Sequence, residues 1–399
     1  MYRLYCRIFQ NALKLSSYLL PWRKPDLVSG KNCLKKLPGI IKEMGVNKVV
    51  IVTGPNVSSS GLMDPLLLGL KEEAVEFFIY NKTVSNPTID NIEEAYSIYK
   101  DNNCDGIIAF GGGSPMDCAK GVGCRVARPQ KAISQMKGLL KVRKKLPPLI
   151  AIPTTAGTGS ETTIAAVISN PATHEKYAIN DTALIPRIAV LDPILTAGLP
   201  PHITAETGMD ALTHAVEAYI GRSNTKETKM MAVKASKLVL DNIYNAYSDG
   251  SDLLVRENMQ RASFYAGVAF TRAYVGYAHA IAHTLGGFYQ VPHGLANAVI
   301  LPYVLEAYGK AAHDRLAELA DAVEITNSTD NKQQKAYKFI ETIKRLNRDM
   351  GIPAKIKGIR SEDIPLMVER AYKEGNPLYP VPKVMNRKEL ECIYRLIMM

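Results

Sequence analysis

One aspartate and three histidines have the types and the spacing to hold a divalent metal ion. They are Asp210, His214, His279 and His293, in the patterns D-x-x-x-H, H-A-I-A-H and P-H-G. The chain has seven histidines, and three of them lie within the stretch 279–293. Carboxylate oxygen and imidazole nitrogen together suit Fe²⁺ or Zn²⁺, and no cysteine belongs to the pattern. The sequence therefore predicts a metal site with these four ligands.

Helical spacing can bring these side chains together. Asp210 and His214 lie four residues apart in a helical stretch, so both project from one face of a helix. His279 and His283 repeat that spacing further along the chain. An alanine stands where the H-E-x-x-H motif of zinc peptidases has its glutamate base, which argues against peptidase chemistry. We expect surface or structural roles for the histidines without such partners: His174, His202 and His313.

Two loops at strand ends predict a nucleotide site. The first loop follows the strand-like G-I-I-A-F and consists of Gly111, Gly112, Gly113 and Ser114. Glycines let the backbone approach a pyrophosphate, and the helix expected to begin at Pro115 favours anions at its N-terminus, although the G-x-G-x-x-G fingerprint is absent. The second loop ends another strand and offers Thr154, Thr155 and Thr158. Open α/β sheets bind ligands at such strand ends, so a nucleotide explains both loops better than plain turns do.

A third strand end bears on the choice of cofactor. The first clear strand ends at Thr53-Gly54-Pro55-Asn56. An acidic residue beside the adenosine ribose would bind its 2′-hydroxyl and repel a 2′-phosphate, but position 54 is glycine. Asn56 and the serines at 58–60 are available as donors. This pattern favours NADP over NAD.

These candidate residues lie on two different kinds of element. A chain of 399 residues is long enough for two domains. From residue 48 strand and helix signals alternate, which predicts a parallel, doubly wound α/β sheet, and from 205 to about 327 the periodicity is helical. We predict an α/β dinucleotide-binding domain over 1–200 and an all-helical metal-binding domain over 201–399. The expected strands are K-V-V-I-V-T, A-V-E-F-F-I-Y-N, G-I-I-A-F, P-L-I-A-I-P-T-T and I-A-V-L-D-P.

The composition and charge of the chain argue against some classes of binding partner. The net charge is +11, but the basic residues are dispersed with few aromatic residues among them, which argues against nucleic acid and leaves phosphate-bearing small molecules. No apolar run reaches the ~20 residues of a membrane span, and we expect a cytoplasmic protein with reduced thiols at its six cysteines. Residues 1–20 place Tyr5, Ile8 and Phe9 at helical spacing among basic residues. That segment either lies on a membrane surface or packs on the protein or a neighbouring subunit.

Four motifs together resemble a known family. They are G-G-G-S-P-M-D, P-T-T-A-G-T-G-S-E, T-G-M-D-A-L-T-H-A-V-E-A-Y and H-A-I-A-H-T-L-G-G-F-Y-Q-V-P-H-G-L-A-N-A-V-I-L-P. In this order they resemble the iron-containing (group III) alcohol dehydrogenases, such as butanol dehydrogenases and lactaldehyde reductases, from about residue 25 onwards. The resemblance implies a Rossmann-like α/β domain with a parallel sheet, followed by an all-α domain, as in dehydroquinate-synthase-like folds.

The resemblance also implies residue roles. The family's metal ligands fall on Asp210, His214, His279 and His293, and His283 matches a histidine that lies near the nicotinamide and moves a proton. The cofactor loops match Gly111 to Ser114 with Asp117 close behind, then Thr154, Thr155 and Thr158, and Lys176 matches a lysine near the cofactor. Two departures concern specificity. Many members carry aspartate at the position of Gly54, and F-S-N-A is here Phe270-Thr271-Arg272-Ala273. Phe270 is a candidate pocket residue, and Arg272 either faces the substrate or is a surface charge.

Together these observations predict an NADP-preferring, metal-dependent dehydrogenase of small primary alcohols that works as an aldehyde reductase. Fe²⁺ is the expected metal, Zn²⁺ and NAD are alternatives, and we expect a homo-oligomer, namely a homodimer. A glycerol or diol dehydrogenase is the nearest rival. A dehydroquinate-synthase-like lyase and a non-catalytic nucleotide-binding protein are the rivals from other classes.

Overall fold

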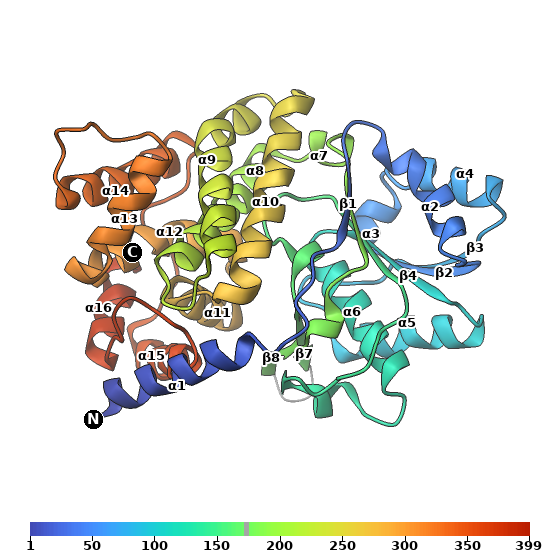
Figure 1. The fold of residues 1–399 in the computed structure, drawn as a ribbon, viewed down its shortest axis with the longest axis horizontal. Coiled ribbons are helices and arrows are strands. Elements are labelled where there is room, and N and C mark those ends of the chain that lie inside the picture. The colour runs from blue at the N-terminus through green and yellow to red at the C-terminus, as the bar shows by residue number, and fades with distance from the viewer. Residues whose placement is uncertain (171–174) are drawn as a thin grey trace. The chain divides into compact units, whose positions relative to one another are not determined.

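The chain divides into two compact units. The computed structural model describes residues 1–170 and 175–399, so His174 lies outside the described residues. One unit is Pro21–Gly198, and the other combines Met1–Leu20 with Leu199–Met399 (Figure 1). The first twenty residues, which we had placed with the α/β domain, thus belong with the C-terminal helices.

A parallel sheet forms the framework of Pro21–Gly198. Among the described residues its six strands have the order β1-β9-β6-β4-β2-β3, and all neighbours are parallel. The strands are β1 (Asp26–Ser29), β2 (Lys48–Val52), β3 (Glu76–Tyr80), β4 (Gly106–Gly111), β6 (Leu149–Pro153) and β9 (Ile188–Leu191). Five of them are the predicted ones, which confirms the α/β class. The short, largely exposed β1 has no apolar run and was missed.

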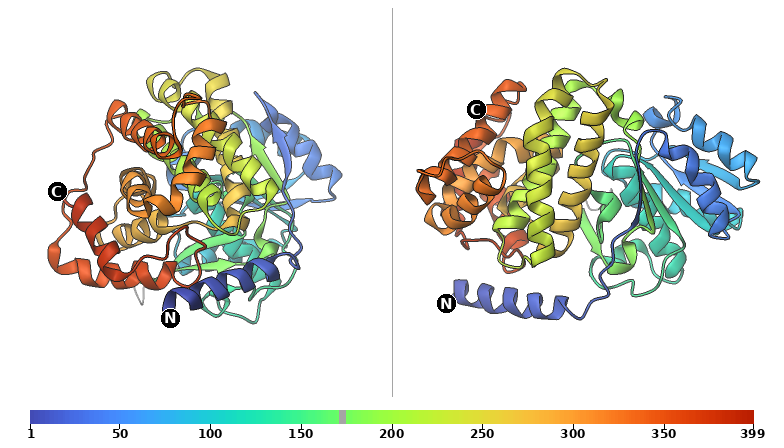
Figure 2. Two further views of the ribbon diagram at one scale, coloured as in Figure 1. Left: turned by 60° about the vertical axis from the view of Figure 1, so that its left-hand side comes forward. Right: turned by 45° about the horizontal axis from the view of Figure 1, so that its top comes forward.

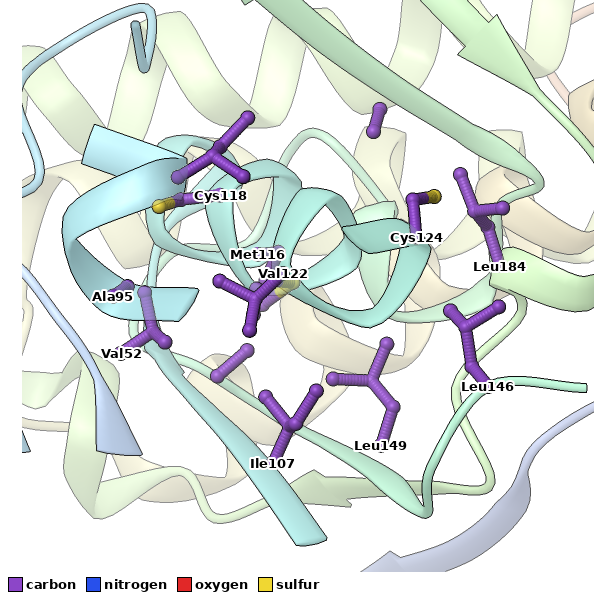
Figure 3. Close-up of a cluster of buried hydrophobic side chains, with 14 of the residues drawn as sticks. Val52, Ala95, Ile107, Met116, Cys118, Val122, Cys124, Leu146, Leu149 and Leu184 are labelled. Carbon is purple, nitrogen blue, oxygen red and sulfur yellow. The ribbon is translucent and has the colours of Figure 1, made fainter. Parts of the chain in front are cut away.

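Helices cover both faces of this sheet. The alternation along β4 sends Ile107 and Ala109 into one apolar cluster and Ile108 and Phe110 into another. The first cluster, drawn in Figure 3, includes residues of α5 and α6, and the second includes residues of α2 and α4. Burial on both faces explains the continuous apolar runs of these strands. The helices of this unit are α2 (Leu37–Glu43), α3 (Pro55–Ser58), α4 (Asp64–Glu72), α5 (Ile89–Asp101), α6 (Gly113–Ala127) and α7 (Ile194–Ala197).

A second, smaller sheet was not predicted. It has the strand order β5-β8-β7, with β7 antiparallel to β8. Its strands are β5 (Gly138–Leu139), β7 (Ala165–Asn170) and β8 (Glu175–Asn180). The sequence E-K-Y-A-I-N mixes polar with apolar residues, and we did not recognise the short apolar run I-A-A-V-I, which leads into β7, as a strand. Short 3₁₀ helices link elements, and one of them, η3 (Ser160–Thr162), bears on the site.

The second unit is helical, as predicted. α8 packs against α9, α10 and α12, and it is buried almost continuously from Gly208 to Ile220, as expected of a central helix. Its helices are α1 (Tyr2–Ser17), α8 (Pro201–Ile220), α9 (Lys226–Ser248), α10 (Leu253–Ala273), α11 (Tyr277–Tyr289), α12 (His293–Tyr308), α13 (Lys310–Ala322), α14 (Lys332–Asp349), α15 (Ile364–Gly375) and α16 (Arg387–Ile397).

α1 packs on this helical unit, next to α15 and α16 (Figures 1 and 2). The face that packs is not the apolar one that we identified. Cys6, Gln10 and Ser17 are buried, whereas Tyr5 and Ile8 are 53% and 61% exposed. Packing on the body of the protein was one of our two alternatives for this segment. Among the described residues, no helix combines the length and the apolar character needed to cross a membrane.

Candidate metal and cofactor sites

Four side chains from three helices converge on one point in the helical unit. α8 carries Asp210 and His214, α11 carries His279, and His293 is the first residue of α12. One ligand atom from each lies within 4.8 Å of the others. Asp210 Oδ1 is 3.6 Å from His293 Nε2 and 4.0 Å from His279 Nε2, and Asp210 Oδ2 is 3.9 Å from His214 Nδ1. The structure therefore brings together all four residues that the sequence singled out.

This donor set fits a divalent cation. Ligands bonded to an ion at about 2.0–2.2 Å in a tetrahedron lie about 3.3–3.6 Å apart, slightly closer than the distances seen here. His279 Nε2 is buried and has no hydrogen-bond partner among the described residues, although it points at the other ligands. Burial, reinforced by the neighbouring imidazoles, holds the pKa of His279 well below its usual value. The imidazole is therefore neutral, which is the form that binds a metal.

Glu217 binds His279 through Nδ1, while Nε2 of the same ring points at the other three candidate ligands. Its carboxylate accepts hydrogen bonds from His279 Nδ1 at 2.6 Å and from the backbone N–H groups of Gly276 at 2.7 Å and Ala278 at 2.8 Å. Burial raises the pKa of Glu217 to about 7. A carboxylate that accepts the Nδ1 proton leaves the Nε2 lone pair directed at the metal position. Glu217 was not among the predicted residues, although it lies three residues after His214 on the same face of α8.

Asn297 joins two of the ligands. It lies one helical turn after His293 on α12 and is fully buried. Its Nδ2 donates to Asp210 Oδ1 at 2.7 Å and lies 3.1 Å from His293 Nε2. Asn297 therefore fixes the rotamer of the aspartate. We missed it too, and its spacing from His293 was the available signal.

His283 lies beside the four ligands but is not one of them. Its ring stacks on that of His293, with centroids 5.2 Å apart. Its Nδ1 lies 2.6 Å from Glu374 Oε1, and the Tyr379 hydroxyl donates to the same oxygen at 2.8 Å. The side chains of His283 and Glu374 are each 31% exposed, so the imidazole can reach solvent or a bound molecule.

The candidate pocket residue Phe270 and the nearby departure from the family pattern, Arg272, have distinct contacts. Phe270 stacks on the ring of His214, with centroids 4.1 Å apart and planes 12° apart, so it covers one face of a candidate ligand. The Arg272 guanidinium lies 5.3 Å from the ring centroid of Tyr18, just after α1. Arg272 thus contacts an aromatic side chain of the N-terminal segment, a cation–π arrangement that neither of our alternatives described.

In the α/β unit, the three predicted loops follow the neighbouring strands β6, β4 and β2. Gly111 has φ +151°, and a Cβ atom there would lie 2.7 Å from Pro115 Cγ. Cβ atoms on Gly112 and Gly113 would lie 3.3 Å from Thr155 Oγ1 and 3.0 Å from Thr158 Cγ2. The Thr154 N–H donates to the Gly111 carbonyl at 3.0 Å. The first two loops therefore pack directly on each other, with α6 starting at Gly113.

A buried polar network fixes the second loop. Asp117 Oδ1 accepts from Ser160 Oγ at 3.0 Å, and Asp117 Oδ2 accepts from the Val167 N–H at 3.1 Å. Lys120 Nζ donates to the Ser160 carbonyl at 2.8 Å and to Thr163 Oγ1 at 2.8 Å. Burial lowers the pKa of Lys120 to about 8. Both oxygens of Asp117 are thus engaged inside the protein, and Asp117 positions the second loop.

Lys176 connects with the first loop through Asn86, which we had not singled out. Lys176 Nζ donates to Asn86 Oδ1 at 2.7 Å, and the Asn86 N–H donates to Ser114 Oγ at 3.2 Å. At the end of β2, Gly54 caps α3 and Asn56 is exposed. The hydroxyls of the serines at 59 and 60 donate to carbonyls of that same short helix.

Comparison with known proteins gives two family matches along the chain. A family described as iron-containing alcohol dehydrogenase matches residues 25–193, and one described as Fe-containing alcohol dehydrogenase family, C-terminal, matches residues 204–398. Helix α1 precedes both matched regions.

Individual proteins are similar over most of their length. The 1,3-propanediol dehydrogenase of Klebsiella pneumoniae is 38% identical over 370 residues, which make up 92% of this chain and 95% of that enzyme. Lactaldehyde reductase of Escherichia coli is 32% identical over 355 residues, 87% of this chain and 92% of that one. The solved structure of an alcohol dehydrogenase from Oenococcus oeni has a TM-score of 0.91 and 35% identity, and the match covers 95% of this chain and 100% of that one.

Proposed function

Because this chain belongs to the iron-containing alcohol dehydrogenase family, we propose that it interconverts small primary alcohols and aldehydes, with NADP(H) preferred and Fe²⁺ as its metal. Membership makes it an oxidoreductase of the alcohol and diol dehydrogenase class. The observation that carries the proposal is the convergence of Asp210, His214, His279 and His293 on one point. Zn²⁺ and NAD are the alternative metal and cofactor.

The two units supply different functional groups. A divalent ion held by the four converging side chains would act as a Lewis acid on the alcohol or aldehyde oxygen, and a nicotinamide would carry the hydride. Asp117 positions the second of the proposed cofactor loops through its hydrogen bonds with Ser160 and Val167. The residues that we propose to hold the dinucleotide are Gly54, Asn56, Gly111, Gly112, Gly113, Ser114, Thr154, Thr155, Thr158 and Lys176.

We assign proton transfer to His283. Its Nδ1 is engaged by Glu374, so Nε2 is the nitrogen left to take a proton from an alcohol or return it to an aldehyde. Phe270, stacked on His214, would give the substrate position an apolar wall. An apolar wall favours short alkyl chains over charged groups.

The preference for NADP is inferred from Gly54. It leaves the end of β2 without a carboxylate that would repel a 2′-phosphate. The exposed Asn56 follows at the start of α3 and can donate to such a phosphate.

A two-way assay tests metal and cofactor together. Oxidation of NADPH and of NADH would each be measured with Fe²⁺ and with Zn²⁺, in anaerobic buffer, over a short series of aldehydes that includes butanal. We expect oxidation of NADPH with Fe²⁺ to be fastest. His279→Ala should abolish it, and the matched control His313→Ala, on α13, should not. Absence of oxidation of either cofactor with either metal would refute the proposal.

A diol substrate is the second candidate. The Klebsiella pneumoniae relative, whose name gives 1,3-propanediol as its substrate, is similar over almost the whole chain. Comparing kcat/KM for 1,3-propanediol and 1-butanol would separate the two, since a second hydroxyl would need a polar partner that the Phe270 ring does not provide. A cytoplasmic location and a homodimer stay predictions.

A further inference from the structure

The segment 376–382 receives several of its hydrogen bonds from α1. Its sequence is N-P-L-Y-P-V-P, with prolines at 377, 380 and 382. Proline has no backbone N–H, so this stretch cannot pair regularly as helix or strand, and its carbonyl groups need donors from elsewhere. α1 supplies several of them, although it precedes both regions matched by the family.

Two side chains of α1 make these contacts. Arg7 and Gln10 donate to four carbonyl groups, at Pro377, Tyr379, Val381 and Pro382. Both bonds from Arg7 measure 2.7 Å, and those from Gln10 measure 2.7 and 3.1 Å. Arg7 Nη1 also donates to Gln10 Oε1 at 2.9 Å, so each side chain holds the other in place. Gln10 is only 3% exposed, so losing these bonds would leave buried polar groups without partners, which destabilises the fold.

The braced segment reaches His283 through two side chains. Tyr379, whose carbonyl accepts from Gln10 at 2.7 Å, donates its hydroxyl to Glu374 Oε1 at 2.8 Å. The same oxygen lies 2.6 Å from His283 Nδ1. A second connection runs through Tyr277 of α11, whose hydroxyl donates to Asn376 Oδ1 at 2.9 Å. The segment is therefore fixed to α1 on one side and to the helix of His283 on the other.

We propose that Glu374 and Tyr379, braced by Arg7 and Gln10 of α1, are positioning residues that hold His283 in the tautomer with its proton on Nδ1. A neutral imidazole has two tautomers, and the partner of one ring nitrogen decides which is present. With Nδ1–H bound to the Glu374 carboxylate, the Nε2 lone pair is free to accept a proton. The tautomer follows from the geometry alone. Only its use in turnover rests on the proposed function.

The tautomer can be measured without any turnover. The full chain would be labelled with ¹⁵N and ¹³C in histidine and studied by NMR at about pH 8.5, where imidazoles are neutral, first without added metal and then with Zn²⁺. The His283→Asn variant assigns the signal. We expect mainly Nδ1–H in the wild-type protein, loss of most of it in Glu374→Ala, and retention in Glu374→Asp.

The brace is tested by variants far from the imidazole. Arg7→Ala/Gln10→Ala and Tyr379→Phe should each raise the Nε2–H fraction severalfold. Arg3→Ala is the matched control on the same helix, because Arg3 pairs with Glu389 of α16 at 3.6 Å. The Arg3→Ala variant should match the wild type. Gln10→Ala alone is the milder variant if the double variant is poorly folded by circular dichroism.

The outcomes separate the two proposals. A wild-type tautomer in Glu374→Ala, or identical spectra for the Arg7→Ala/Gln10→Ala and Arg3→Ala variants, would overturn the positioning role. A changed tautomer with unchanged kcat would support positioning by Glu374 and refute proton transfer by His283. A changed tautomer with a proportionate fall in kcat, rescued by Glu374→Asp, supports both.

Discussion

At Glu217, one carboxylate accepts from His279 Nδ1 and from two backbone N–H groups. Glutamine has nearly the same shape but replaces one acceptor oxygen with a donor, which would face one of those three N–H groups. Partners of this kind typically change metal affinity by about 10–100-fold. We therefore expect Glu217→Gln to weaken Zn²⁺ binding by about that factor, measured by competition with a chromogenic chelator. Glu257→Gln, a surface residue paired with Arg261 on α10, is the control that should bind as the wild type does.

A second residue-level prediction concerns pH. Burial raises the pKa of Glu161 from its ordinary value of 4.5 to about 7. Between these values the folded state keeps a proton that the unfolded state has lost, so the stability contributed by Glu161 is present below pH 4.5 and is lost as the pH rises through 7. Across that window the free energy of unfolding of the wild type should fall by up to about 3 kcal/mol relative to that of Glu161→Gln, as measured by urea unfolding. Glu217 is present in both proteins, so its contribution to the pH dependence of stability cancels in this comparison. Parallel pH profiles would contradict the assignment.

Residue types at helical spacing predicted a candidate metal site, because Asp210 and His214 share one face of a helix and His279 and His283 repeat that spacing. Asp210, His214, His279 and His293 converge as expected. Glu374 could not be predicted in the same way, since it reaches His283 from α15, far along the chain. Residue spacing predicts which side chains share a face of one helix. Contacts between side chains of different helices can be known only from the folded structure.

At the scale of elements, the β4–α6 turn depends on Gly111. A methyl group there would lie 2.7 Å from the Pro115 ring, at a φ of +151° that alanine rarely adopts. Crowding of this kind costs about 1–3 kcal/mol, so Gly111→Ala should displace the first loop and weaken NADPH binding by about tenfold. Fluorescence titration measures this without metal. In the control Gly39→Ala on α2, the new Cβ meets only Glu73 Oε1 at 3.9 Å, and affinity should not change. Equal affinities for the two variants would contradict a cofactor role for this turn.

The strands buried on both faces were predictable, whereas the strands of the small sheet were not. β2, β4 and β6 are nearly all apolar because helices cover both sides. β7 alternates buried and partly exposed residues and pairs in a small separate sheet. For α1 the helix itself was expected, but the face that packs is set by hydrogen bonds from Arg7 and Gln10, which apolar periodicity does not register.

At the scale of the whole molecule, the two ligand sets lie in different units. The four proposed metal ligands all belong to Leu199–Met399, and the proposed cofactor loops all belong to Pro21–Gly198. A ligand that binds only the folded protein stabilises it, by about 2.7 kcal/mol at a hundred times its Kd. In calorimetric unfolding we therefore expect Zn²⁺ to stabilise the helical unit and NADPH to stabilise the α/β unit. Asp210→Asn should lose the Zn²⁺ shift and keep the NADPH shift, because the Asp210 carboxylate lies against Asn297 and the three histidines of the helical unit. A Zn²⁺ shift that survives this substitution would place the metal elsewhere in the protein.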